Sequence, residues 1–383
     1  MAQEVYVWQR VWTDPVGAAV KERAEQFDGV CVLVAEVDRK GDGSWEVQRF
    51  ADPEAYARGH EVSLAVRIAS GASISAWDRE SCDRIVSLLG HYAGMTSVFQ
   101  IDYDCPSGKL SDYVRLCAAL RRAFPDHRLE LTCLPDWLGR DGFSSLVEYA
   151  DRYVMQVHGL LGYGGGQRLC DPELAREAAW QCGELGVPFL IALPTYRHAV
   201  GVGVDGGILD VVSEGEELRQ GVTYQLRGAD HQEMASLVRE WEESRPESMI
   251  GVIWYRLPVD GESMNWTWAS LQRVMQGMEV EKQWSMKMEP QDDGMYLLKL
   301  ENKTVANLEL PRVLQVSWLS GYCLTSDGMG AYKVSHLERD SKAVLKWQGG
   351  DPRPMPPGTS LAVAWFRYHV QPEAGFRIIE CRE

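Results

Sequence analysis

The sequence lacks long apolar runs and an excess of positive charge. None of its apolar runs reaches the ~20 residues that a membrane-spanning helix needs, so we expect no membrane span. The 39 Lys and Arg residues are outnumbered by 55 Asp and Glu residues, and the formal net charge is −16 at pH 7. Because a nucleic-acid backbone attracts positive charge and no stretch of this chain is rich in Lys or Arg, we expect no nucleic-acid partner.

Signatures of metal, disulfide and nucleotide sites are also missing. The nine cysteines form no C-x-x-C pair, which argues against a zinc ribbon and against a dense disulfide framework. The chain contains neither G-x-x-x-x-G-K-[ST] nor H-E-x-x-H, and its G-x-G-x-x-G match at 201–206 lies in a long connection and opens no helix. The sequence therefore predicts no metal and no cofactor.

The start of the chain leaves two cellular locations open. Met1-Ala2-Gln3 leads directly into an apolar strand pattern. This start fits an exported or periplasmic protein whose signal has been removed, and it also fits a native cytoplasmic start. We expect a monomer in either location.

The first three quarters of the chain alternate between two kinds of pattern. Short β-type runs lie at 4–12, 29–37, 62–68, 98–105, 129–135, 152–158, 188–196 and 249–258. Stretches with helical spacing lie between them at 16–27, 78–92, 111–124, 143–149, 172–185 and 230–244. Eight strands with intervening helices predict an α/β fold of the (β/α)₈ TIM-barrel type over residues 1–285.

The pattern changes at about residue 285. Short alternating runs at 296–300, 313–318, 332–337, 343–347, 360–368 and 376–381 are separated by turn residues, and no helical pattern occurs among them. Residues 286–383 are therefore predicted to form a C-terminal antiparallel β-sandwich, an accessory domain.

The strongest candidate for a catalytic group is the end of the fourth β-type run, Gln100-Ile101-Asp102-Tyr103-Asp104. Alternate strand residues share a face, so Asp102 and Asp104 lie on one side about 7 Å apart. Like charges this close raise one pKa and leave the other carboxylate ionised, which is how an acid and its partner are made. A structural ion network with nearby arginines is the alternative interpretation.

The ends of the other strands carry polar or aromatic residues, whereas the strand beginnings are mostly apolar. In a TIM barrel the active site lies at the C-terminal ends of the strands, so we expect these side chains to line one mouth. The candidates for substrate binding are Trp8, Arg10, Glu36, Arg67, Gln156, His158, Tyr196, Trp254 and Arg256. The alternative is that the arginines and carboxylates form a network that only closes the barrel.

Two long connections, 159–167 and 197–228, are expected on the same rim. Connections of this length are often functional, although they can also be surface decoration. The second contains Glu214, a further candidate that could reach the mouth.

Several stretches carry resemblances to known families. Ile101-Asp102-Tyr103-Asp104-Cys105-Pro106 resembles the fourth-strand I-D-W-E-Y-P of family 18 chitinases, and Gly251-Val252-Ile253-Trp254 resembles their eighth strand. The resemblance implies that Asp104 is the general acid, that Asp102 holds the substrate's N-acetyl group, and that Trp254 forms the floor of a sugar subsite. The chain departs from that family by having Asp rather than Glu at 104 and Val157-His158 in place of the sixth-strand Tyr-Asp.

A second resemblance covers most of the barrel. The chain resembles an uncharacterised bacterial family of unknown function that has a glycosidase-like barrel and a C-terminal β-sandwich. The matching stretches are V-W-Q-R-V-W at 7–12, Q-I-D-Y-D-C-P at 100–106, L-T-C-L-P-D-W at 131–137, A-L-P-T-Y at 192–196 and W-Y-R-L-P at 254–258. These motifs are specific to the family and not to a reaction.

Two functions remain open from the sequence. The first is a glycoside hydrolase acting on a polysaccharide or glycoconjugate, with Asp104 as proton donor and Asp102 as electrostatic partner. Arg67 and Gln156 would orient the substrate, and Trp8 and Trp254 would stack on it. If the N-acetyl resemblance fails, Glu36 or Glu214 would be the second carboxylate. The alternative is a non-catalytic barrel that binds glycans in the same groove.

Overall fold

The computed structural model describes residues 1–50, 62–69, 77–159, 168–203, 207–320, 322–338, 342–349, 353–369 and 374–379. The chain forms two compact units. The first comprises Met1–Tyr196, Gly228–Asp260 and Val274–Met278, and the second comprises Arg197–Arg227, Gly261–Arg273 and Glu279–Glu383.

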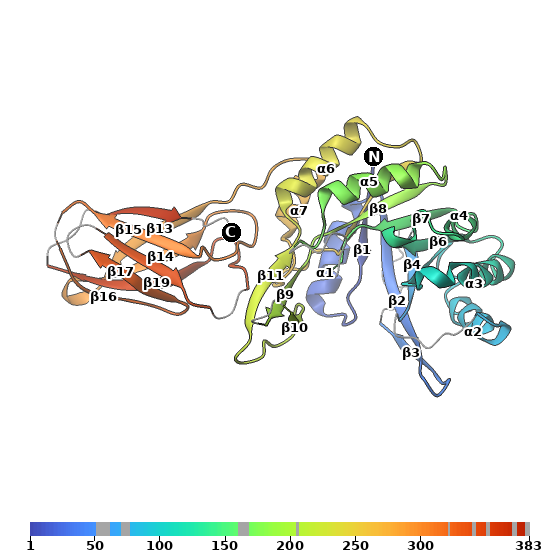
Figure 1. Cartoon of the computed structure of the whole chain (residues 1–383), viewed down its shortest axis with the longest axis horizontal. Helices are drawn as coiled ribbons and strands as arrows, with labels where there is room; N and C mark the ends of the chain where they lie inside the picture. The colour runs from blue at the N-terminus through green and yellow to red at the C-terminus, as the bar shows by residue number, and fades with distance from the viewer. Residues whose placement is uncertain are drawn as a thin grey trace. The chain divides into compact units, whose positions relative to one another are not determined.

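The eight predicted strands of the first unit close into a parallel barrel (Figure 1). They are β1 (Ala2–Val7), β2 (Gly29–Arg39), β4 (Val62–Ile68), β5 (Val98–Tyr103), β6 (Arg128–Cys133), β7 (Arg152–Gln156), β8 (Phe189–Pro194) and β12 (Met249–Tyr255). Each strand pairs in parallel with its neighbours, and β1 closes the ring by pairing with both β12 and β2. The predicted (β/α)₈ barrel is confirmed.

Barrel closure depends on a glycine. Ala2 of β1 pairs with Gly251 of β12. A Cβ atom at Gly251 would lie 2.1 Å from the carbonyl oxygen of Ala2, closer than real contacts allow. Only glycine therefore permits the first and last strands to approach this closely.

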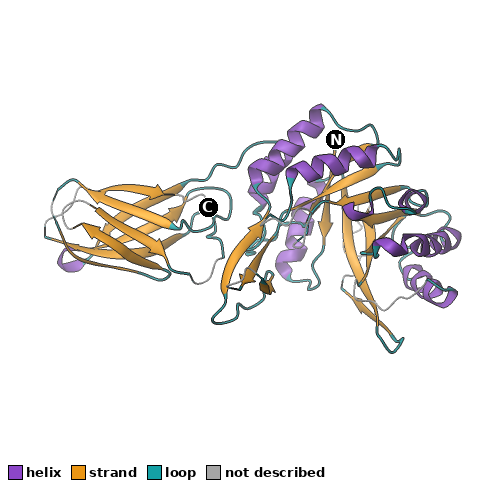
Figure 2. Ribbon diagram, in the orientation of Figure 1, coloured by secondary structure: helices purple, strands orange, loops and turns teal. Residues whose placement is uncertain are grey.

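Helices cover the outside of the barrel (Figure 2). They are α1 (Asp14–Arg23), α2 (Arg79–Gly90), α3 (Leu110–Ala123), α4 (Phe143–Val147), α5 (Pro172–Gly183) and α6 (His231–Glu243). Three of them begin at an aspartate whose side chain accepts a backbone N–H, namely Asp78 for α2, Asp171 for α5 and Asp230 for α6. Such caps satisfy amide groups that the helix itself cannot pair. No described helix is long and apolar enough to cross a membrane.

Several elements were not predicted from the sequence. Strand β3 (Trp45–Arg49) pairs antiparallel with β2, and α7 (Trp268–Met275) follows the barrel. The 197–228 connection is largely a three-stranded sheet of the second unit, with β9 (Arg197–Val202) between β10 (Ile208–Val212) and β11 (Thr223–Gly228). In the other predicted rim loop, 159–167, only Gly159 falls within the described residues, and in the 201–206 glycine motif only 201–203 do.

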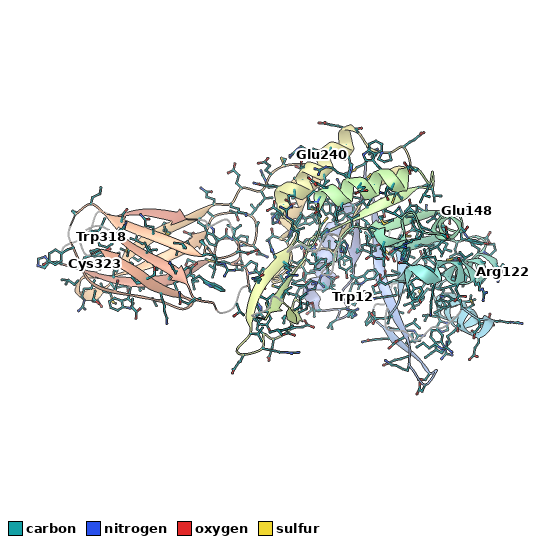
Figure 3. The ribbon with its side chains drawn as sticks, in the orientation of Figure 1. Trp12, Arg122, Glu148, Glu240, Trp318 and Cys323 are labelled. Atoms are coloured by element: carbon teal, nitrogen blue, oxygen red, sulfur yellow. The ribbon has the colours of Figure 1, made fainter. Side chains whose placement is uncertain are left out.

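The C-terminal part of the second unit is the predicted sandwich. One sheet has the order β13-β14-β19-β16, with β13 (Trp284–Pro290), β14 (Met295–Asn302), β19 (Ser360–Tyr368) and β16 (Cys323–Gly328). The other has the order β17-β18-β15-β20, with β17 (Tyr332–Glu338), β18 (Lys342–Trp347), β15 (Val313–Trp318) and β20 (Ala374–Ile379). Buried Leu298, Leu314, Trp318 and Phe366 belong to the core between them, and Figure 3 labels Trp318 and Cys323 there. The sequence had indicated neither β13 nor β16.

Candidate functional site

The end of the barrel opposite the mouth, which we call the floor, contains a buried cluster of ionic side chains. Glu4, Glu130 and Arg152 come from β1, β6 and β7, and the guanidinium binds both carboxylates. Arg152 Nε donates to Glu130 at 2.6 Å, and its two terminal nitrogens donate to the two oxygens of Glu4 at 2.5 and 2.9 Å. Burial raises the pKa of Glu130, and the charge of Arg152 opposes that rise. The strand beginnings were expected to be mostly apolar, and these three ionic residues are exceptions that pair with one another inside the barrel.

Polar side chains continue from this floor toward the mouth. Gln100 donates from Nε2 to Glu130 at 3.0 Å and accepts the hydroxyl of Tyr6 at 2.7 Å. One strand repeat above Gln100 lies Asp102, whose side chain is only 5% exposed. Thr132 Oγ1 and Gln156 Nε2 both donate to Asp102 Oδ1, at 2.6 and 3.1 Å. These bonds hold Asp102 in one orientation on the inner face of the barrel.

Arg67 is the centre of the charged half of the mouth. Strand register aligns Glu36 with Arg67 and Arg67 with Asp102 across three neighbouring strands. The guanidinium lies 3.8 Å from Asp102, 3.6 Å from Asp104 and 4.0 Å from Glu36. Burial would lower the pKa of Arg67, but the charges of Asp102 and Asp104 outweigh it and raise the pKa. Arg67 therefore stays charged among the carboxylates.

Asp104 is the carboxylate that a ligand can reach. It follows the last residue of β5, and its side chain is 34% exposed against 5% for Asp102. Burial and the negative charge of Asp102 raise the pKa of Asp104, and Arg67 opposes the rise. A partly exposed carboxyl group with a raised pKa can keep a proton and deliver it to a leaving group.

Glu36 is held at the edge of the same cluster. Arg10 donates to Glu36 Oε2 from Nε at 3.3 Å and from a terminal nitrogen at 2.8 Å. The register of β2 shifts between Leu33 and Ala35, and beyond this shift Glu36 is paired with Arg67. The structure thus brings five of the predicted residues together, namely Arg10, Glu36, Arg67, Asp102 and Asp104.

The other half of the mouth is aromatic and centres on Tyr255. Its ring centroid lies 5.7 Å from Trp8, 5.3 Å from His158 and 5.4 Å from Tyr196. Tyr196 and His158 are also joined through the Tyr196 hydroxyl and His158 Nδ1, at 3.3 Å. Burial raises the pKa of Tyr255 to about 12, although Arg67 and Arg256 oppose the rise. The charges that act on Tyr255 show that the aromatic half adjoins the arginine–carboxylate half.

Trp254 does not line this mouth. It is fully buried, and its indole nitrogen donates to Gln3 Oε1 at 2.7 Å. Its neighbours Ile253 and Tyr255 pack with the inner barrel cluster, so alternation directs Trp254 outward. The prediction of Trp254 as a stacking floor is wrong, and Tyr255 occupies the inner position.

The ends of β8 and β12 are fastened to each other. The buried hydroxyl of Thr195 donates to the Arg256 carbonyl at 2.6 Å and accepts the Arg256 N–H at 2.8 Å. These bonds fix the backbone beside Tyr196 and Tyr255. The positive charge of Arg256 acts on both tyrosines, which places its side chain close to the aromatic half.

Glu214 belongs to the second unit. Its carboxylate accepts the backbone N–H of Met264, which is also in the second unit. This bond gives Glu214 a structural partner. Its role as a second carboxylate stays a prediction.

Two residues of the first unit were missed by the sequence reasoning. Tyr255 stands next to the chosen Trp254 and differs only in the phase of the strand. Asp136 lies in the turn after β6, accepts the hydroxyl of Ser107, and adds a negative charge that raises the pKa of Asp104. Because it lies in a turn, no strand periodicity pointed to Asp136.

The described residues contain no group of three or more His, Cys, Asp or Glu side chains that could hold a metal ion. Eight cysteines fall within these residues, and all are buried thiols outside disulfides.

Comparisons with solved structures show the fold. The spore cortex-lytic enzyme SleL from Bacillus cereus aligns with a TM-score of 0.53 at 11% identity, covering 73% of this chain and 74% of that one. SleL from Bacillus megaterium gives 0.51 at 12% identity, with the same coverage. A chitinase from Chromobacterium violaceum gives 0.51 at 14% identity, covering 72% of this chain and 98% of that one.

The comparison with protein families gives a membership. No curated protein matches the sequence. A family model described as a domain of unknown function, DUF3142, matches residues 65–260, just over half of the chain. That segment carries Arg67, Asp102, Asp104 and Tyr255. The chain belongs to the DUF3142 family and folds as a barrel of the type seen in chitinases and cortex-lytic enzymes.

Proposed function

We propose that this protein is a glycoside hydrolase acting on a polysaccharide or glycoconjugate. The observation that carries the proposal is the pair of carboxylates at the mouth, with Asp102 locked by hydrogen bonds and Asp104 exposed with a raised pKa. Two carboxylates whose environments differ in this way can divide the roles of proton donor and electrostatic partner. We place the site in the barrel, residues 1–285, and assign the sandwich, residues 286–383, an accessory role.

Arg67 would orient the substrate. The three carboxylates approach its guanidinium no closer than 3.6 Å, whereas charge-assisted hydrogen bonds are about 2.7–2.9 Å long. These long contacts leave its N–H groups able to donate to sugar hydroxyls. Gln156 would support this arrangement indirectly, because its amide holds Asp102.

Tyr255 would form the floor of the sugar subsite. Its ring is half-buried and is held by Tyr6, Trp8, His158 and Tyr196, so a sugar could stack on it with little loss of side-chain freedom. Trp8 is 4% exposed and would act by supporting Tyr255.

The structural neighbours suggest the first substrates to test. Chitin oligosaccharides and cortex peptidoglycan fragments should be included in a panel of α- and β-linked oligosaccharides. We expect the wild-type protein to cleave at least one of them. Asp104→Asn keeps the shape of the side chain and removes the proton, so it should lower kcat by about 10² or more while the substrate still binds.

A non-catalytic glycan-binding barrel is the second candidate. The observation in its favour is Asp104 itself, because an aspartate reaches one methylene less far than the glutamate at this position in family 18 chitinases. If wild type and Asp104→Asn bind the same oligosaccharide equally well and neither cleaves it, the binding protein is the correct function.

A further inference from the structure

A cavity of about 180 Å³ lies between α5 and the ends of β6 and β7. Its walls come from the turn after β6, from the end of β7 and from α5. They include Pro135, Leu138, Val157, Gly159, Glu177 and Gln181. None of these residues belongs to the carboxylate and aromatic groups of the mouth.

The cavity and the mouth share two backbone segments. On β7, the inward Gln156 binds Asp102, and the next residue, Val157, lines the cavity. In the turn after β6, Pro135 lines the cavity, while its neighbour Asp136 acts on the pKa of Asp104. The cavity and the mouth therefore adjoin each other at the ends of β6 and β7.

The position of that turn is well determined by hydrogen bonds. Trp137 is fully buried, and its indole nitrogen donates to the carbonyl of Cys105 at 3.0 Å. The Ser107 hydroxyl donates to Asp136 in the same turn. Both bonds join the turn to the segment that directly follows Asp104, so the cavity wall and the proposed acid are fixed relative to each other.

The chemistry of the lining suits a sugar ring. Leu138, Val157 and Leu174 provide apolar surface for the C–H face of a pyranose. Gln181 donates one N–H to Glu177 at 2.9 Å, and its amide has a second N–H and a carbonyl oxygen for sugar hydroxyls. The volume is below the roughly 300 Å³ of the smallest drug-sized pockets, so one sugar unit fits better than a longer segment.

An exposed aromatic ring lies on α5, the helix that forms one wall of the cavity. Trp180 is 56% exposed on α5. It is three residues beyond Glu177 on the helix, a spacing that makes the two side chains neighbours on the helix surface. An indole beside the lining residue Glu177 offers a flat surface on which the next sugar can stack.

We infer that this cavity, together with Trp180, is an accessory subsite that holds one sugar unit of the same glycan that is cleaved at Asp104. The inference rests on the proposed function and extends it from short to long substrates. Its polar groups favour a glycan over an apolar peptide.

Calorimetric binding to Asp104→Asn protein, in which turnover should be slower by about 10² or more, tests the inference. The probes are the hexamer and the dimer of β-1,4-linked N-acetylglucosamine. Adding Gln181→Ala or Trp180→Ala should weaken hexamer binding by about five- to tenfold, the effect of losing roughly one hydrogen bond or stacking contact. Dimer affinity should change by less than about twofold, since the dimer is too short to span both the mouth at residue 104 and the cavity.

The matched control is Glu184→Ala, an exposed residue at the end of α5 that does not line the cavity. It should leave both affinities as they are. If the hexamer binds equally well to Asp104→Asn protein with and without Gln181→Ala or Trp180→Ala, the inference is overturned and the proposed function is not affected. If the parent binds neither probe, this inference fails for chitin-type glycans, and wild-type cleavage of other members of the oligosaccharide panel separately decides the proposed function.

Discussion

The buried charges at the barrel floor make a strong prediction about stability. Arg152 compensates two carboxylates whose side chains are almost inaccessible, Glu4 at 7% and Glu130 at 1% exposure. Arg152→Met keeps much of the side-chain length and removes the charge. Breaking a buried ion pair by removing one partner costs about 3–5 kcal/mol, because the remaining charge is desolvated without compensation.

The matched control is a similar pair at the surface. Arg176 of α5 binds Glu240 of α6, which Figure 3 labels, through two hydrogen bonds of 2.5 and 2.8 Å. These side chains are 36% and 42% exposed. Since exposed pairs contribute about 0–1 kcal/mol, Arg176→Met should cost less than about 1 kcal/mol.

Urea unfolding followed by the helical circular dichroism signal measures both losses. The longest helices, α3 and α6, belong to the first unit, so this signal mainly follows the barrel. In Arg152→Met the folded-state pKa of Glu130, which burial already raises, should rise further above the value of about 4.3 for an unfolded chain, because the opposing charge of Arg152 is gone. The folded state then binds more protons than the unfolded state, so stability falls as the pH rises.

The stability deficit of Arg152→Met should therefore be full near pH 8 and become smaller as the pH falls through the raised pKa of Glu130 toward about pH 5. The Arg176→Met deficit should remain small across that range. Equal losses in the two variants, or an Arg152→Met deficit that does not shrink toward low pH, would refute the reasoning.

Two further changes test the mouth and the barrel closure. Arg67→Gln removes the positive charge that lowers the pKa of Asp104. The alkaline limb of the pH profile of kcat/KM should therefore move up by about one pH unit, even if the rate also falls. An alkaline limb that stays in place or moves down would contradict the assignment of Asp104 as the acid. Gly251→Ala would place a methyl group against the Ala2 carbonyl, so it should abolish folding or sharply lower the urea concentration at which half of the barrel unfolds. Gly17→Ala is the control, because Gly17 has open space around it and the change should have little effect. Equal urea midpoints for the two variants would contradict the closure geometry.

The barrel could be predicted because each of its eight strands and each of the helices α1 to α6 carries its own local signal. Every barrel strand is a short β-type run, and three of the helices start at an aspartate cap that can be read directly. Strands β13 and β16 gave weaker signals. Their sequences, W-S-M-K-M-E-P and C-L-T-S-D-G, contain many polar or turn-forming residues and resemble connections.

The site could be predicted only in part, because the phase of a strand is not a local property. Alternation separates Trp254 from Tyr255 but does not say which of them faces inward. In β12 the register shifts between Met249 and Gly251, and this irregularity changes the phase that simple counting gives. The same limit applies to β2, whose register shifts before Glu36.

Long-range pairs were beyond the reach of the sequence pattern. Glu4 and Arg152 are separated by 148 residues and meet only because the barrel closes. Asp136 reaches the neighbourhood of Asp104 because the buried Trp137 and the Ser107 hydroxyl fix its turn. Neither relation produces a periodic signal.

A crystal structure of Asp104→Asn protein with an oligosaccharide that the wild type cleaves tests the central claim most directly. We predict one sugar ring against Tyr255, a hydroxyl bound to Arg67, and the glycosidic oxygen about 2.6–3.2 Å from the side chain of residue 104. A glycan bound elsewhere on the molecule, with the mouth around Arg67 and Tyr255 empty, would contradict it.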